Sequence, residues 1–387
     1  MKFDFDKAVE RRGTGCVKWD EMPSPHVIPL WVADMDFAVA PAIEKAIKAR
    51  AQHPVFGYTY VQDDYYEAVV SWYKRRHGWD IQREWIIYTT GVVPAVSAVL
   101  KALTMPGERV VTLTPAYNCF FSSIRNTGCE LADCALQWSG SRFEIPWKEL
   151  DELCQDERTS VLLLCNPHNP TGRVWTEQEL HRIGTICRRN KVRVVSDEIH
   201  CELVMPKQHF TPMGYLDPTA VTLSSPSKSF NIAGLQIANI ICKDADLRRR
   251  INRAININEV CDVNSFAPEA VKAAYNDSEE WLDELNVYIE GNYEALCSFC
   301  KQHLPQWRVM PLEGTYLAWV DCTSACGDNH IEDYTQRILE EAEVWLNPGT
   351  MYGTKDDEHY LRINLACPRS RLLEALERIA KMEGQEG

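Results

Sequence analysis

Short apolar runs alternate with amphipathic stretches through the middle of the chain. Helical periodicity occupies residues 95–103, and a Thr176-x-x-Glu179 capping box opens a second helical stretch that continues to about residue 190. Continuous apolar strands separated by helices are typical of a mostly parallel sheet with helices on both faces. The predicted strands are residues 85–90, 109–113, 160–165, 192–196, 220–224 and 237–242. We therefore predict an α/β fold for this part of the chain.

The two ends of the chain carry a different pattern. Charges and prolines in residues 1–30 indicate an irregular arm, and helical periodicity follows at 41–52 and 63–77. After a largely helical stretch at 244–300, the order strand, helix, strand, helix predicts a small α+β domain. Those last elements are residues 307–321, 330–343, 361–366 and 370–383.

The length of the chain favours two domains. Single hydrophobic cores stop growing at roughly 250–300 residues, and this chain has 387. We expect a large α/β domain at residues 46–284. We expect a second unit in which an N-terminal arm, residues 1–45, joins a small C-terminal α+β domain, residues 285–387.

Charge and cysteine content narrow the possible partners and compartment. The net charge of −14 argues against nucleic acid and anionic membranes as partners. No apolar run approaches the roughly 18 residues of a membrane span, and the acidic start lacks the apolar core of an export signal. The 15 cysteines are scattered, so we expect reduced thiols in a cytoplasm. Cys297-x-x-Cys300 has no second pair at metal spacing, and no metal is expected.

Polar residues follow the predicted strands where each strand ends. Gly91 separates one strand from a helix start, which is a geometry that binds anions. Tyr117, Asn169, Asp197 and Lys228 follow four of the other strands. In open α/β sheets, ligands bind beyond the carboxyl ends of the strands. We therefore expect these side chains to share one site.

Lys228 has the sequence context of a reactive amine. It lies between two apolar runs and is flanked by Ser225, Ser227 and Ser229. Burial lowers the pKa of a lysine, because the ammonium loses its water, and the neutral amine can then attack a carbonyl. Schiff-base chemistry with pyridoxal 5′-phosphate (PLP) needs such a lysine, and neighbouring hydroxyls suit a phosphate. Taken alone, the same stretch also fits an ordinary solvated lysine.

Each remaining candidate has a structural interpretation and a chemical one. Asp197 is either a helix N-cap or the carboxylate that pairs with a protonated pyridine nitrogen. Asn169 either stabilises a turn or donates a hydrogen bond to the cofactor's phenolic oxygen. Tyr117 is either a core aromatic or a ring stacked on the cofactor, and His200 alone fits a structural histidine. Arg362, inside an apolar strand, needs either a buried acid or a substrate carboxylate.

Four motifs give the chain a recognisable family character. They are Asn166-Pro-His-Asn-Pro-Thr-Gly172, Ser196-Asp-Glu-Ile-His200, Ser225-Pro-Ser-Lys228 and Arg362-Ile-Asn-Leu-Ala366. With them, the chain resembles fold-type I PLP enzymes of the class I/II aminotransferase superfamily over essentially its whole length. That resemblance implies a mostly parallel, seven-stranded sheet between helices in the large domain.

Within the superfamily, the chain is most similar to the MalY/PatB group of cystathionine β-lyases. The motifs that carry this likeness are Trp31-Val-Ala-Asp-Met-Asp-Phe37, Phe56-Gly-Tyr-Thr59, Gly91-Val-Val-Pro94, Phe230-Asn-Ile-Ala-Gly-Leu-Gln236, Asn347-Pro-Gly349 and Asn364-Leu-Ala-Cys-Pro-Arg369. Typical aminotransferases have a phosphate-binding arginine where this chain has Gln236. Cys119 stands where a proline is expected.

The resemblance implies a role for each matching residue. Lys228 would bind PLP covalently and move the substrate proton, Asp197 would pair with the pyridine nitrogen, and Tyr117 would stack on the ring. Asn169 and His200 would flank the phenolic oxygen. The implied phosphate contacts are Val92, Val93, Ser225 and Ser227, with Tyr58 reaching the phosphate of the neighbouring subunit. The implied substrate contacts are Ala33 and Arg362.

The implied reaction is β-elimination of cystathionine or another cysteine S-conjugate to pyruvate, ammonia and a thiol, in a homodimer with shared sites. The same groups serve an aminotransferase that passes an amino group to a 2-oxo acid, which is the alternative. A PLP-binding regulator acting through protein contacts is a further alternative from another class.

Overall fold

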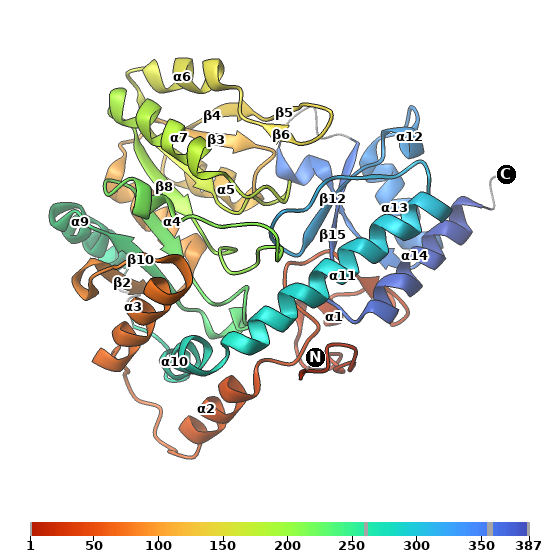
Figure 1. Cartoon of the computed structure of the whole chain (residues 1–387), viewed down its shortest axis with the longest axis horizontal. Coiled ribbons are helices and arrows are strands. Elements are labelled where there is room, and N and C mark those ends of the chain that lie inside the picture. The colour runs from red at the N-terminus through yellow and green to blue at the C-terminus, as the bar shows by residue number, and fades with distance from the viewer. Residues whose placement is uncertain (1, 259–261, 354–358, 385–387) are drawn as a thin grey trace.

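A seven-stranded sheet forms the centre of the computed structural model, which describes residues 2–258, 262–353 and 359–384 (Figure 1). The strand order is β2–β10–β9–β8–β7–β3–β4. β10 pairs antiparallel with β2 and β9, and the other pairs are parallel, so the predicted mostly parallel sheet is confirmed. The strands are β2 (Ile86–Thr89), β3 (Arg109–Thr114), β4 (Glu130–Ala135), β7 (Thr159–Cys165), β8 (Arg193–Asp197), β9 (Val221–Ser224) and β10 (Ala238–Cys242).

Strand β7 shows how the sequence places its side chains on the two faces of the sheet. Successive side chains of a strand point to opposite faces. Val161 and Leu163 accordingly pack in one hydrophobic cluster, and Leu162 and Leu164 pack in the other. The first cluster is covered by α4 (Val92–Leu103), α5 (Asn118–Asn126) and α9 (Ala245–Ile255), and the second by α6 (Trp147–Gln155), α7 (Glu177–Arg189) and α8 (Met213–Leu216).

The predicted N-terminus of α7 is present as a reciprocal cap. The Glu179 backbone N–H donates to Thr176 Oγ1 at 3.2 Å, and the Thr176 backbone N–H donates to Glu179 Oε2 at 2.8 Å. The capping box therefore sets the start of this helix, as the sequence predicted.

A long helix connects the large sheet to a second, smaller sheet. This helix, α11 (Glu279–His303), runs from α10 toward α13 and α14 (Figure 1). The smaller sheet is antiparallel in the order β11–β12–β15–β14. The remaining elements here are α2 (Pro41–Ala51), α3 (Asp63–His77), α10 (Ala267–Asp277), β11 (Arg308–Val309), β12 (Leu317–Asp321), α12 (Thr323–Cys326), α13 (Ile331–Glu341), β14 (Asn347–Pro348), β15 (Tyr360–Asn364) and α14 (Arg369–Glu383).

One strand prediction in the small sheet is corrected by the structure. Residues 307–321 were expected to form a single strand, and they form β11 and β12 with an irregular loop between them. Glu313, in that loop, donates its backbone N–H to Gly172 O at 2.9 Å, and its backbone oxygen accepts from the Met205 N–H at 3.0 Å. These bonds to the large sheet's loops interrupt the strand.

The N-terminal arm is more ordered than its composition indicates. Within residues 1–30, which were expected to be irregular, lie α1 (Val17–Asp20) and β1 (Ile28–Pro29), and β1 pairs with β13 (Val344–Trp345). The fully buried carboxylate of Asp36 anchors the arm through Lys18 Nζ at 3.2 Å and Arg371 Nη1 at 3.1 Å. A buried charge requires such partners, so the ion cluster fixes the path of the chain just after Trp31.

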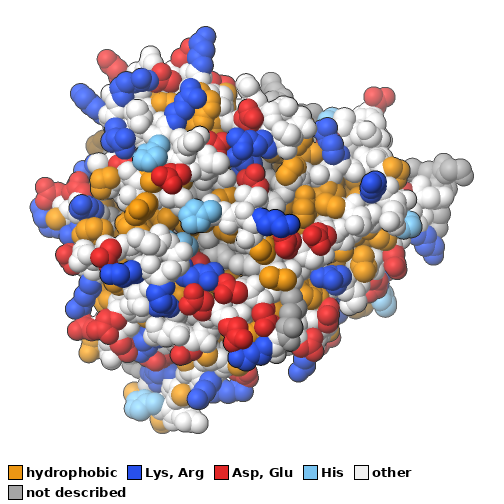
Figure 2. All heavy atoms as spheres, viewed as in Figure 1, with side chains coloured by type: hydrophobic (Ala, Val, Ile, Leu, Met, Phe, Trp, Pro, Cys, Tyr) orange, Lys and Arg blue, Asp and Glu red, His pale blue; other side chains and the backbone are white. Residues whose placement is uncertain are grey.

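The surface seen in Figure 2 carries acidic and basic side chains intermixed. Among the described residues, none of the helices combines the length and apolarity needed to cross a membrane.

Candidate active site

A cavity of about 390 Å³ opens beyond the carboxyl ends of β3, β7 and β8. Most of the predicted site residues line it, although they come from distant parts of the sequence. They are Ala33, Val92, Val93, Tyr117, Asn169, Asp197, His200, Ser227, Lys228 and Arg362. Two predicted residues, Ser225 and Tyr58, do not line this cavity within the chain.

Lys228 reaches the cavity from the loop that follows β9. Its Nζ donates to the backbone oxygen of Ala33 at 2.5 Å. Burial lowers the pKa of Lys228 to about 8, with the Arg362 charge acting in the same direction, while Asp34 and Asp197 oppose the shift. A far larger fraction of this amine is therefore uncharged near neutral pH than of a solvated lysine, and attack on a carbonyl requires the uncharged form.

Asp197 ends β8 as a buried carboxyl group with little stabilisation from its surroundings. Its Oδ1 accepts from the Ile199 N–H at 3.1 Å, and 4% of the residue is exposed. Burial raises the pKa of Asp197 to about 7, and the Ile199 hydrogen bond and the Lys228 charge only partly offset this. A cation bound in the cavity against this group would hold it in the ionised form. A protonated pyridine nitrogen is such a cation.

The guanidinium of Arg362 carries a buried positive charge that its described neighbours do not balance. Its Nη1 donates to Asn169 Oδ1 at 3.2 Å and its Nη2 donates to Trp31 O at 2.8 Å, while Nε has no hydrogen-bond partner. The guanidinium also lies 4.8 Å from the centroid of the Tyr352 ring. In the described part of the chain, no carboxylate forms an ion pair with it. Of the two sequence interpretations, a buried acid partner is therefore not found, and a ligand carboxylate fits.

His200 is a neutral histidine at the cavity wall. Burial lowers its pKa to about 3, and the positive charges of Lys228 and Arg362 contribute. Its Nδ1 is buried and has no hydrogen-bond partner. A buried polar atom of this kind calls for a ligand or water to complete it.

The first turn of α4 provides a place for an anion. Gly91 precedes the helix in an extended conformation, and Val92 and Val93 occupy the first two helical positions at the cavity wall. Backbone N–H groups in a first helical turn have no partners within the helix, and the helix dipole favours negative charge there. Ser227 lines the same region.

Ser225 shapes the lysine loop with its hydroxyl group. Its Oγ donates to Ile237 O at 2.6 Å and accepts from the Ser227 N–H at 3.1 Å. These two bonds fix the turn that presents Ser227 and Lys228 to the cavity.

Tyr58 lies on the outside of the chain. It is fully exposed, and Val55, Phe56 and Tyr60 beside it are also largely exposed. A run of large apolar side chains on the surface is typical of a protein–protein contact.

Several residues at or behind the cavity wall were not predicted from the sequence. Asn347 Nδ2 donates to Trp31 O at 3.0 Å, and the Trp31 ring stacks on Trp345 with the ring centroids 4.9 Å apart. The hydroxyl of Tyr316 donates to Ala33 O at 3.0 Å. Trp31 and Asn347 stood in the recognised motifs, which was the available signal. Tyr316 looked like an ordinary strand residue.

Glu198, next to Asp197 but outside the cavity wall, gives the protein a pH-dependent stability. It is fully buried, its Oε1 accepts from the Met213 N–H at 2.8 Å, and burial raises its pKa to about 8. The carboxyl of an unfolded chain titrates near ~4.3. Between these two pH values the folded protein keeps a proton that the unfolded chain has lost. The free energy of unfolding therefore falls as the pH rises, by about 1.4 kcal/mol per pH unit.

Replacing Glu198 with glutamine removes that dependence. We expect Glu198→Gln to gain about 2 kcal/mol of stability relative to the parent protein between pH 6 and pH 8. Urea unfolding of both proteins at the two pH values measures the difference. An equal stability difference at both pH values would contradict the assigned proton.

The chain matches known proteins over nearly its full length. The family model "Aminotransferase class I and II" matches residues 25–379. The chain is 38% identical to "Cystathionine beta-lyase PatB" of Bacillus subtilis, over 97% of this chain and 98% of the relative. It is 32% identical to "Protein MalY" of Escherichia coli, over 96% of each. Cystalysin from Treponema denticola, whose crystal structure contains PLP, superposes with a TM-score of 0.96 at 33% identity, covering all of both chains.

Proposed function

This chain belongs to the class I and II aminotransferase family, and from that membership we propose that it is a PLP-dependent carbon–sulfur β-lyase. It converts a cysteine S-conjugate such as cystathionine, with one water, into pyruvate, ammonia and a thiol. Its identity to a cystathionine β-lyase over almost the whole chain supports the lyase over the aminotransferase alternative. The observation that carries the proposal is the depressed pKa of Lys228 in a cavity that also holds Asp197 and Arg362.

The cavity residues fit PLP on their own chemistry. Asp197 supplies a buried carboxylate for the ring nitrogen, and the unpaired Nδ1 of His200 lies in the same cavity wall as Asn169. The first turn of α4 with Ser227 suits the phosphate, Tyr117 offers a ring face, and Lys228 offers the amine. When bound, PLP supplies an electron sink that stores the electron pair of the broken Cα–H bond and returns it to expel sulfur from Cβ.

The protein's own groups bind and orient the substrate and move its proton. The planar guanidinium of Arg362 binds the substrate α-carboxylate with two hydrogen bonds, and this carboxylate becomes its ion-pair partner. Ala33 O and Trp31 O, held by Tyr316 and Asn347, fix the wall against which the amino acid lies. The uncharged amine of Lys228 takes the Cα proton as general base.

The reaction is tested by supplying cystathionine without any 2-oxo acid. We expect continuous release of pyruvate and thiol over many turnovers. Product formation that stops after one equivalent, and resumes when a 2-oxo acid is added, would identify an aminotransferase.

Arg362 determines carboxylate binding, so its substitution will act mainly on KM. We expect Arg362→Lys to lower kcat/KM by roughly 30-fold or more, because truncating one partner of a buried charge pair costs about 2–5 kcal/mol. Lysine keeps the charge but loses the bidentate fork. Steady-state kinetics with cystathionine measures the change. A kcat/KM within threefold of the parent would exclude this role.

The exposed aromatic segment around Tyr58 supports a homodimer in which Tyr58 contacts the partner's phosphate site. We expect Tyr58→Ala and Lys228→Ala to complement each other, because a mixed dimer has one site with both native residues. Statistical mixing would restore about one quarter of the native sites. Activity after co-refolding the two variants is the measurement. No gain over the unmixed variants would rule out sharing.

We also propose the division into a large domain at 46–284 and a second unit of residues 1–45 with 285–387, in a cytoplasmic enzyme. The two separate sheets support the division. The fact that every described cysteine is free supports a reducing compartment.

A further inference from the structure

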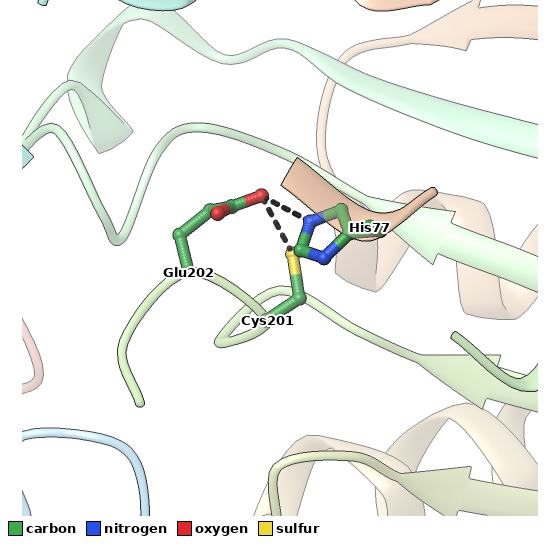
Figure 3. Close-up of side chains that lie close together, drawn as sticks. All are labelled: His77, Cys201 and Glu202. Atoms are coloured by element: carbon green, nitrogen blue, oxygen red, sulfur yellow. Dashed lines mark hydrogen bonds and ion pairs between the residues drawn. The ribbon is translucent and has the colours of Figure 1, made fainter. Parts of the chain in front are cut away.

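Outside the active site, three side chains of different chemistry converge at one point. His77 is the last residue of α3, and Cys201 and Glu202 lie in the turn that follows β8 (Figure 3). His77 Nε2 lies 2.7 Å from Glu202 Oε1, and Cys201 Sγ lies 3.6 Å from the same oxygen. All three ligand atoms lie within 4.8 Å of one another. The three side chains are almost completely buried.

The spacing of these atoms can be compared with that of a zinc site, and the His77 nitrogen and the Cys201 sulfur lie within 4.8 Å of each other. Imidazole nitrogen, thiolate sulfur and carboxylate oxygen are the zinc ligands found in proteins, at about 2.0–2.3 Å from the ion. In a tetrahedral site, such ligands stand roughly 3.3–3.6 Å apart. The sulfur–oxygen pair already has this spacing. The nitrogen–oxygen pair must open by roughly 0.6 Å, which a small movement of the His77 ring at the end of α3 would provide.

Neighbouring groups hold the carboxylate of Glu202 in place. Trp72 Nε1 donates to Glu202 Oε1 at 2.6 Å, and Arg76 Nε lies 3.7 Å from Oε2. Its two oxygens therefore face an indole N–H and a guanidinium, which are the partners of an ionised carboxylate. Outer contacts of this kind orient the carboxylate ligands of metal sites.

Cys201 supplies the third proposed ligand atom, its sulfur. Its Sγ donates to Glu202 Oε1 at 3.6 Å, so in the absence of an ion the thiol carries its proton against that carboxylate. A dication placed between the two groups would reverse this balance, because a coordinating thiol is deprotonated outright.

We propose that His77, Cys201 and Glu202 form a binding site for a thiophilic divalent cation, best matched by Zn²⁺. On binding, Cys201 releases its proton to solvent, and the Nε2 proton of His77 is replaced by one on Nδ1. One proton is released per ion, and the two anionic ligands balance the charge of the ion. The fourth position faces a cavity of about 440 Å³ that His77, Cys201 and Glu202 line together with His209. Water can occupy it.

Occupation of the site would tie three elements together. His77 belongs to α3, and Cys201 directly follows His200 of the active-site wall. Asn286 of α11 donates to Glu202 O at 2.8 Å. An ion that binds only the folded protein therefore stabilises the junction of these segments.

The test uses Co²⁺ as a spectroscopic probe of the holoenzyme freed of adventitious metal. We expect one equivalent of Co²⁺ to give a thiolate-to-metal charge-transfer band that Zn²⁺ displaces. Cys201→Ser should remove the band, and His77→Gln should weaken Co²⁺ binding by at least about 100-fold. The matched control is Cys297→Ser, a partly exposed thiol of α11 that should leave the band unchanged.

Two further readouts separate a metal site from a hydrogen-bonded cluster. Calorimetry in buffers of different ionisation enthalpy should show one proton released per Zn²⁺, and the unfolding midpoint should rise until one equivalent has bound. PLP absorbance of each variant confirms that it is folded. The absence of a charge-transfer band in the parent protein, or its persistence in Cys201→Ser, would overturn the proposal and leave the three residues as a hydrogen-bonded cluster.

Discussion

Replacing Lys228 with alanine will abolish β-elimination, with kcat/KM falling by at least about 10⁴-fold. This amine has two tasks, attaching the cofactor and removing the Cα proton, and no other described lysine lines the cavity. Alanine leaves the loop intact, because Ser225 shapes it through its own hydrogen bonds. The variant should therefore fold, bind PLP weakly and fail in chemistry.

Pyruvate release from cystathionine, followed under single-turnover conditions, measures the loss. Lys207→Ala is the matched control, because this lysine is exposed and lies away from the cavity. The parent rate is expected for the control. A Lys228→Ala variant that retains more than a few per cent of the parent rate would show that another base performs the proton transfer. A PLP-binding regulator, in contrast, would keep its biological effect in this variant.

The second large effect is expected at Asp197. Asparagine has the shape of aspartate but cannot carry the charge that holds a proton on the pyridine nitrogen. We expect Asp197→Asn to lower kcat by roughly 10²–10³-fold, which is the range observed when one electrostatic partner of a developing charge is removed. Burial raises the pKa of Asp197 to about 7, so the protein's own groups give the ionised form only weak support.

Glu198→Gln is the natural control for Asp197→Asn. Glu198 is the next residue and is fully buried, but it does not line the cavity. A rate within a fewfold of the parent is expected for it at pH 7. Comparable losses in the two variants would mean that disturbing the end of β8, and not the charge on the cofactor, accounts for the effect.

The sheet was predictable where apolar runs are long. β7 contains a continuous apolar run at residues 161–165, β8 contains the shorter pair Val194 and Val195, and polar motifs mark the carboxyl ends of both strands. β4 could not be found in the same way, because it is an edge strand whose buried residues, Ala132 and Cys134, are small and alternate with polar or exposed neighbours. The loop between β11 and β12 depends on the hydrogen bond from Glu313 to Gly172, which joins segments far apart in the sequence.

The site residues likewise divide into those that local motifs predict and those that depend on long-range contacts. Lys228, Asp197 and Asn169 belong to local motifs, and the structure brings them to one cavity. The wall made by Trp31 and Asn347 requires the arm to pack on the small sheet, which the buried Asp36 cluster directs. Local patterns do not contain such long-range contacts.

The proposed lyase requires PLP to be attached to Lys228. The measurement is borohydride reduction of the purified yellow protein, followed by proteolysis and mass spectrometry of the peptides. We expect loss of the visible absorption band and one cofactor adduct per chain, located on Lys228. An adduct on a different lysine, or a colourless protein that takes up no PLP when it is supplied, would contradict it.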